Sequence, residues 1–158
     1  RIGEAQTRAY VTCNSCKFTD AVPNYEITAK ITLSNSGQSP ASKIVYRGKV
    51  TVESSEDKRG LVLWSENPNA PPRMAFGLSA GEARHDITVT RDTPLTIEEY
   101  NKITEGTAAF FVYVKIDYVD VFGMVSSVEQ RLMSRPHPIS KAEPSRYGNE
   151  YKWGYKKA

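Results

Sequence analysis

The stretch YEITAKITLS, from Tyr25 to Ser34, decides the fold class of this 158-residue chain. Apolar and polar residues alternate strictly along it. This alternation is typical of a strand in an antiparallel sheet, with one face buried and the other in water. The strand is expected to end in the turn-forming run 35–40, where Gly37 is able to adopt a positive φ and Pro40 blocks continuation.

Working outward from this stretch, the same reasoning predicts further short strands. Gly48 lies inside one of them, which suggests a bulge or a close backbone approach. Asp120–Gly123 is expected to form a hairpin turn, with Gly123 in the left-handed conformation. The predicted strands cover a β-like segment around residues 10–11 and residues 43–53, 61–64, 83–90, 108–118 and 124–133, while residues 74–78 are expected to pack back onto the sheet.

A single short helix is predicted at about residues 93–105. Thr93 and Pro94 suit a helix start, Thr96 and Glu99 have the spacing of a capping box, and Gly106 stops the helix. Such a helix would cross over between two strands. Seven or eight short strands with one cross-over helix predict an all-β antiparallel sandwich, because the alternating strands need a second layer to cover their apolar faces.

The C-terminal segment 134–158 reads differently from the body. Three prolines interrupt it and it has no period, so a tail or wrapping arm is expected. The net charge of the whole chain is only +3, which does not favour a nucleic-acid partner, but this segment is basic. Its aromatic residues interleave with basic ones and are candidates for contact with a partner or a surface: Tyr147, Tyr151, Trp153, Tyr155, Lys152 and Lys156. Packing on the domain's own sheet edge, or on a neighbouring subunit, is the alternative.

Two segments resemble bacterial domains. Residues 31–41, ITLSNSGQSPA, resemble the strand-turn signature of bacterial immunoglobulin-like domains, including those related to cell adhesion. Residues 116–123, IDYVDVFG, are similar to the late hairpin of small bacterial membrane-anchored proteins of unknown function. In those proteins a membrane helix and a helical stalk precede the domain, and residues 3–11 look like the stalk junction. The resemblance implies a stalk end at 1–8, an immunoglobulin-like β-sandwich at 9–133 and display on the periplasmic side of a membrane, with the cytoplasmic side as the alternative.

Cys13 and Cys16 are the only cysteines, in the run Thr-Cys-Asn-Ser-Cys-Lys. This spacing suits a local disulfide or two free thiols, half of a zinc site, or a redox pair. Pro23 argues against a helix starting at Cys16, which a redox motif would usually need. A zinc site would need two more ligands, for which His85 and His137 are candidates, either within one chain or across a dimer.

Motifs of known enzymes are not found in this sequence. It has no glycine-rich phosphate loop, no His-Glu-x-x-His and no Gly-x-Ser-x-Gly. His85 and Asp86 are neighbours on a predicted strand and would point to opposite faces. Asp120 is expected to cap its turn through a side-chain hydrogen bond, although Asp117 and Asp120 could instead bind a cation.

We therefore expect no catalytic residues and no cofactor, with zinc at Cys13 and Cys16 as the exception. The predicted function is a non-catalytic protein-interaction module displayed from a bacterial membrane protein. Its partner is an unidentified protein, and self-association into a homo-oligomer is an open alternative. A metal- or redox-responsive domain that uses the cysteine pair is the second hypothesis.

Overall fold

The computed structural model describes residues 7–56, 75–81, 83–134, 140–144 and 149–158. These residues form nine strands and one short helix. The elements are β1 (Val11–Phe18), β2 (Thr28–Asn35), β3 (Ala41–Ser54), β4 (Phe76–Leu78), β5 (Ala83–Thr90), α2 (Ile97–Glu105), β6 (Ala108–Val119), β7 (Met124–Ser134), β8 (Lys141–Pro144) and β9 (Glu150–Lys157). The expected class, all-β with one helix, is confirmed.

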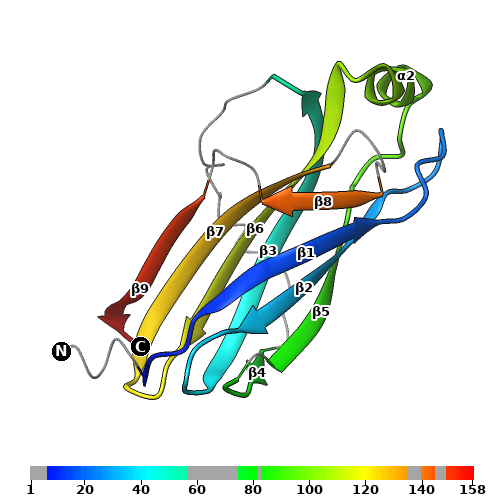
Figure 1. Cartoon of the computed structure of the whole chain (residues 1–158). Helices are drawn as coiled ribbons and strands as arrows, with labels where there is room; N and C mark the ends of the chain where they lie inside the picture. Colours follow the sequence, from blue (N-terminus) through cyan, green and yellow to red (C-terminus); the bar gives the residue numbers. More distant parts are fainter. Residues whose placement is uncertain (1–6, 57–74, 82, 135–139, 145–148) are drawn as a thin grey trace.

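All strand pairs are antiparallel and join into one nearly closed sheet. The order is β4-β3-β6-β7-β8-β1-β2-β5, and β9 also pairs with β7. Figure 1 shows β1, β2 and β5 in front of β3, β6 and β7, with β8 crossing between the two groups at the upper end. β7 meets β9 along Met124–Glu129 and β8 along Leu132–Ser134. Two strands from the C-terminal segment therefore share one side of β7.

The core lies between these two groups of strands, and the alternating faces predicted from the sequence line it. Ile31 and Leu33 of β2 are fully buried, as are Phe110, Val112 and Ile116 of β6. The first half of β6 is also buried on its other face, because Phe111 and Tyr113 form a second, smaller apolar cluster with Ala109 and Met133. Coverage of both faces explains why this strand is the most hydrophobic stretch of the chain.

The predicted helix is confirmed, and it begins after Thr96 and not at Thr93 and Pro94. Thr96 is the N-cap and completes a capping box with Glu99, while Gly106 is the left-handed C-cap. The buried side chain of Ile103 faces the core. The helix connects β5 to β6, as expected of a cross-over.

Several strand predictions need correction. The strand starting at Tyr25 begins at Thr28, and the expected strand at residues 61–64 lies outside the described residues. Nine strands are described where seven or eight were expected. The additional strands β8 and β9 come from the segment expected to be an irregular arm. That segment does wrap the domain, but through backbone pairing to β1 and β7.

The turn after β2 is built around Asn35, which is fully buried. Its Oδ1 accepts hydrogen bonds from the N–H groups of Tyr10 and Gly37, at 3.1 and 3.0 Å, and its Nδ2 donates to the carbonyl of Ser39 at 2.8 Å. Gly37 is not among the residues with positive φ, contrary to expectation. It is a glycine because a Cβ there would lie 2.2 Å from the carbonyl oxygen of Arg8.

Candidate functional site

The two cysteines lie in β1 and both face the core. A β-bulge interrupts the pairing of β1 with β2 between Cys13 and Ser15. Because one extra residue reverses the in–out alternation of a strand, Cys13 and Cys16 point to the same side instead of opposite sides. Their exposed fractions are 3% and 2%, and both thiols are free. Cys13 is also tied to β7, since its N–H donates to Oε1 of Gln130 at 2.6 Å.

This environment disfavours the thiolate, which is the form that binds metals and attacks substrates. Burial raises the pKa of Cys16 to about 12, and it raises the pKa of Cys13 further, with an added contribution from Cys16. Among the described residues, no three His, Cys, Asp or Glu side chains are grouped so that they could hold a metal ion. His85 stacks on Phe76 with ring centroids 4.2 Å apart, and His137 lies outside the described residues. The zinc site stays an untested prediction, and the geometry of its two cysteines is that of buried apolar side chains.

Most of the aromatic and basic candidate residues of the C-terminal segment lie in β9, which pairs with β7. Trp153 is half-buried and packs against the core, with its ring 4.9 Å from that of Tyr10 in an edge-to-face arrangement. Tyr151 and Tyr155 are exposed, as are Lys152 and Lys156. Tyr147 lies outside the described residues. Trp153 thus packs on the domain itself, which leaves the exposed tyrosines and lysines as the candidate surface contacts.

The hairpin between β6 and β7 is organised by Asp120, as its turn motif predicts. Its Oδ1 accepts hydrogen bonds from the N–H groups of Phe122 and Met124 at 2.9 and 3.0 Å. Its Oδ2 lies 2.9 Å from Nε of Arg8, and the aspartate side chain is fully buried. Gly123 has φ of +71°, so the predicted left-handed turn position is confirmed. Asp120 therefore serves the turn and the ion pair with Arg8.

A buried arginine on the other face of the sheet is a feature that the sequence reading missed. The side chain of Arg131 in β7 is 1% exposed and its guanidinium carbon lies 4.1 Å from the centre of the Phe111 ring. Glu53 of β3 lies 3.7 Å from its Nη2 and accepts a hydrogen bond of 2.7 Å from the Tyr113 hydroxyl. Burial, followed by the bond and charge of Glu53, raises the pKa of Tyr113 to about 12. These contacts link β3, β6 and β7 to one another on this face of the sheet.

Among the described strands, none joins β3 to β5, which lie at the two ends of the strand order apart from the short β4. β4 pairs with β3 only at Ala41 and Ile44, so the stretch from Val45 to Ser54 has β6 on one side and no described strand on the other. β5 likewise has β2 on one side only, within the part of the chain that the structure describes. An open strand edge presents unpaired N–H and C=O groups that can bind another extended chain.

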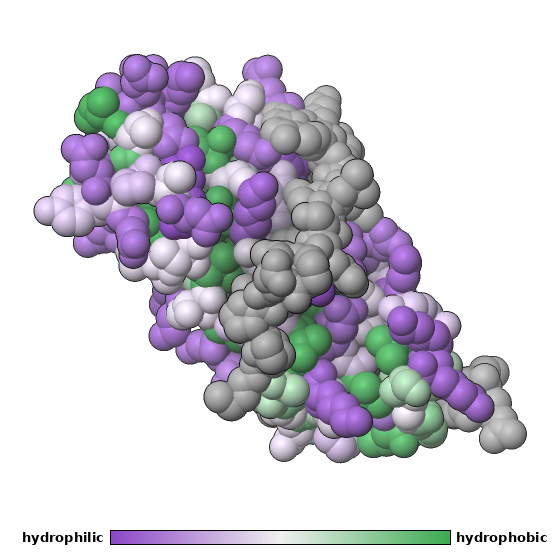
Figure 2. Space-filling view, turned by 180° about the vertical axis from the view of Figure 1, so that it is seen from behind, coloured by the Kyte–Doolittle hydropathy of each residue, from purple (hydrophilic) through white to green (hydrophobic). Residues whose placement is uncertain are grey.

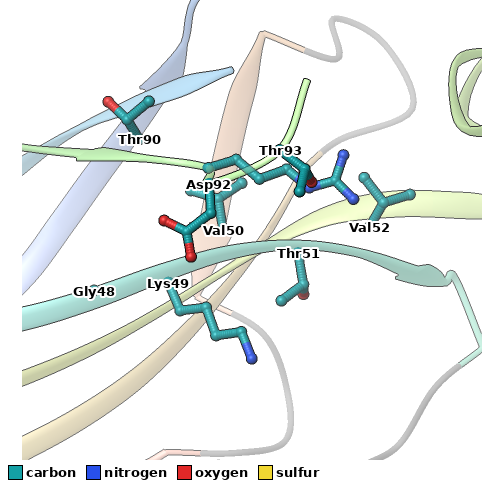
Figure 3. Close-up of a pocket in the computed structure, with 9 residues that line it drawn as sticks. Gly48, Lys49, Val50, Thr51, Val52, Thr90, Asp92 and Thr93 are labelled. Atoms are coloured by element: carbon teal, nitrogen blue, oxygen red, sulfur yellow. The ribbon is translucent and has the colours of Figure 1, made fainter. Parts of the chain in front are cut away.

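A groove of about 280 Å³ runs along this opening. Residues 48–52 of β3 form one wall, and Thr90 at the end of β5 with the three residues 91–93 that follow it forms the other. In Figure 3, Val50 and Val52 point to one side of β3 while Lys49 and Thr51 point to the other, and Asp92 reaches from the opposite wall towards β3. The groove thus combines an unpaired backbone edge with alternating apolar and polar side chains.

Gly48 gives this groove its shape. A Cβ at Gly48 would lie 2.3 Å from Cγ2 of Val89, so the side chain of Val89 fits against β3 only because residue 48 has none. The glycine predicted a bulge or a close backbone approach; the register shows no bulge at Gly48, and the close neighbour is the side chain of Val89 in β5. Gly48 was the one signal in the sequence that pointed to this region.

No protein-family model matches this chain, and neither does any curated protein or solved structure. Within the described residues, no helix has the length and apolar character needed to cross a membrane.

Proposed function

We propose that this domain is a non-catalytic protein-interaction module that binds an extended segment of a partner protein by strand addition to the open edge of β3. The observation that carries the proposal is the outer backbone edge of residues 47–52 of β3, which lies beside the groove and which no second strand pairs with in the part of the chain that the structure describes. In strand addition the backbone hydrogen bonds give affinity, and alternate side chains give specificity. Residues 47–52 hold no proline, and their pairing with β6 has no register shift, so this part of the edge is regular enough for strand addition.

The side chains of β3 indicate which segment would fit. Arg47 and Lys49 are exposed on the outer face of the edge, while Val50 and Val52 line the inner face. A partner strand with acidic residues at alternate positions and apolar residues between them would complement both faces.

The test starts with a displayed library of short random peptides selected against the chain. Peptides that bind at β3 should slow amide hydrogen exchange along residues 45–54 and leave β9 unchanged. The variant Arg47→Glu/Lys49→Glu should lose most of the affinity for acidic peptides. The matched variant Lys17→Glu/Lys102→Glu, on exposed residues elsewhere, should keep it. Selected peptides that protect other strands, or that bind both variants equally, would contradict the proposal.

The finer parts of the proposal concern the fold family and the location. We propose an immunoglobulin-like sandwich displayed from a bacterial membrane anchor on the periplasmic side. Support comes from the resemblance of residues 31–41 and 116–123 to such domains. Fractionation of cells that make the natural full-length protein, followed by protease treatment of intact spheroplasts, tests this part. A protein found free of the membrane fraction would contradict it.

A further inference from the structure

The hairpin between β6 and β7 exposes apolar side chains at one end of the molecule. Val121 is 54% exposed and Phe122 is 42% exposed, although a four-residue turn of this kind is ordinarily filled with polar residues. Figure 1 shows this hairpin at the lower end, and Figure 2 shows hydrophobic side chains on the surface at the same end, beside hydrophilic ones. An exposed apolar pair at the tip of a rigid hairpin suggests a contact surface.

The turn is held so that these side chains stay outside. Asp120 accepts hydrogen bonds from the N–H groups of Phe122 and Met124 and forms the buried ion pair with Arg8. The guanidinium carbon of Arg8 also lies 5.9 Å from the centre of the Phe122 ring. A contact made by side chains that are already positioned costs little conformational entropy on binding.

Basic side chains surround the apolar tip. Lys156 and Lys157 of β9 are exposed and pair with Val125 and Met124, which directly follow the turn. The N–H of Ala158 donates to the carbonyl of Gly123 at 2.9 Å, so the end of β9 lies against the hairpin.

Lys43 adds a third basic side chain near this tip. Lys43 is exposed at the bulge of β3, next to Ser42, which pairs with Val119 just before the turn. Asp120 is the only acidic residue of the turn, and its charge is compensated by Arg8. Lys43, Lys156 and Lys157 therefore place positive charge beside the tip, and Nζ of Lys156 lies 5.5 Å from the centre of the Tyr155 ring, whose hydroxyl makes it amphipathic.

We propose that this end of the domain, formed by Val121, Phe122, Lys156 and Lys157, docks onto the surface of an anionic lipid bilayer. Phe122 and Val121 would enter the boundary between headgroups and acyl chains, while the lysines would contact lipid phosphates. Apolar side chains flanked by cations and aromatic rings are suited to this interface. The inference does not depend on strand addition at β3, because the two surfaces share no residue.

The test is co-sedimentation of the chain with phosphatidylcholine vesicles that contain, or lack, phosphatidylglycerol. We expect binding only to the anionic vesicles and weaker binding at high salt. Because each basic side chain near an anionic surface contributes a factor of about five in affinity, Lys156→Gln/Lys157→Gln should weaken binding roughly 30-fold. Val121→Ser/Phe122→Ser should weaken it by roughly tenfold or more, since it removes the buried apolar area.

Matched controls come from the opposite end of the molecule. Tyr25→Ser/Ile97→Ser removes two apolar side chains there, of which the first is 66% exposed and the second 54%. Lys17→Gln/Lys102→Gln removes two positive charges. Both variants should bind like the natural sequence. Phe122→Trp should show blue-shifted difference fluorescence on anionic vesicles, and Tyr25→Trp should not.

Three outcomes would overturn the inference. One is the absence of binding to anionic vesicles at low salt. Another is equal loss of binding in the tip variants and the control variants, which would indicate general charge attraction. The third is binding to a single-stranded oligonucleotide, with none to vesicles, that the lysine variant abolishes.

Discussion

Loss of the carboxylate of Asp120 should destabilise the domain more than loss of any exposed acidic group. The side chain is fully buried and its two oxygens do separate work: Oδ1 accepts two backbone hydrogen bonds and Oδ2 faces Nε of Arg8 at 2.9 Å. Apart from this contact with each other, neither Oδ2 nor Nε has a hydrogen-bond partner within the described residues. Each charge of the pair therefore depends on the other.

The two substitutions Asp120→Asn and Asp120→Ala separate these contributions. Asparagine keeps an oxygen for the two N–H groups but leaves Arg8 without its counter-charge. Because the Arg8 side chain is 16% exposed, water relieves part of this cost, and we expect about 2 kcal/mol, below the ~3–5 kcal/mol of a fully buried pair. Alanine also removes two hydrogen bonds of about 1 kcal/mol each, which gives about 4 kcal/mol in total. For a domain of this size these losses lower Tm by about 6 and 12 °C.

The assay is thermal and urea unfolding followed by circular dichroism. Arg8→Met completes a double-mutant cycle with Asp120→Asn, and the double variant should lose less than the sum of the single losses, by at least about 1 kcal/mol. Equal stability of Asp120→Asn and Asp120→Ala would refute the role of Oδ1. Strict additivity in the cycle would refute the coupling to Arg8.

Three further predictions follow from other contacts. Gly48→Ala should lower the free energy of unfolding by about 1–3 kcal/mol, because the added Cβ clashes with Val89. Adding Val89→Ala to the same chain should restore most of this loss. A Gly48→Ala variant as stable as the natural sequence would contradict the close packing of Val89 on β3. Cys13 and Cys16 should react with iodoacetamide at neutral pH only after unfolding, because burial raises the pKa of both thiols. Mass spectrometry of the native protein after labelling checks this. Rapid labelling of the native protein, or bound zinc that is lost in a Cys13→Ser variant, would instead favour the metal or redox hypothesis. The bidentate ion pair with Arg91, followed by hydrogen bonds to Thr96, lowers the pKa of Glu99, so its contribution to stability should be present at neutral pH and fade as the pH falls through its folded pKa. Glu99→Gln should therefore cost about 1 kcal/mol at pH 7 and progressively less as the pH is lowered, as measured by urea unfolding at a series of pH values.

Local patterns in the sequence were sufficient for most of the fold. The alternation of residues 25–34 and 108–118 predicted two strands that face the core, and the capping box of Thr96 and Glu99 predicted the helix start. Asp120 was correctly expected to close its turn. These features depend on residues within a few positions of one another, so the sequence displays them directly.

The strands in the segment after Ser134 could not be predicted from local sequence patterns. Its prolines and its lack of a period predict an irregular arm, yet β8 and β9 form because β7 offers them an unpaired backbone. A strand that exists through its partner leaves little trace in its own residues. The same holds for the candidate surface contacts: Trp153 packs against Tyr10, while Tyr151 and Tyr155 remain exposed.

By itself, then, the sequence determined the class of the fold, the helix with its caps and the hairpin turn, because short-range periodicity and turn chemistry encode them. Only the tertiary structure decided that a bulge turns Cys13 and Cys16 to the same side, that Arg131 is buried against Phe111, and that residues 47–52 of β3 pair with β6 alone among the described strands. Each of these depends on the register between strands that are distant in the chain. That register is set by the packing of the whole sheet.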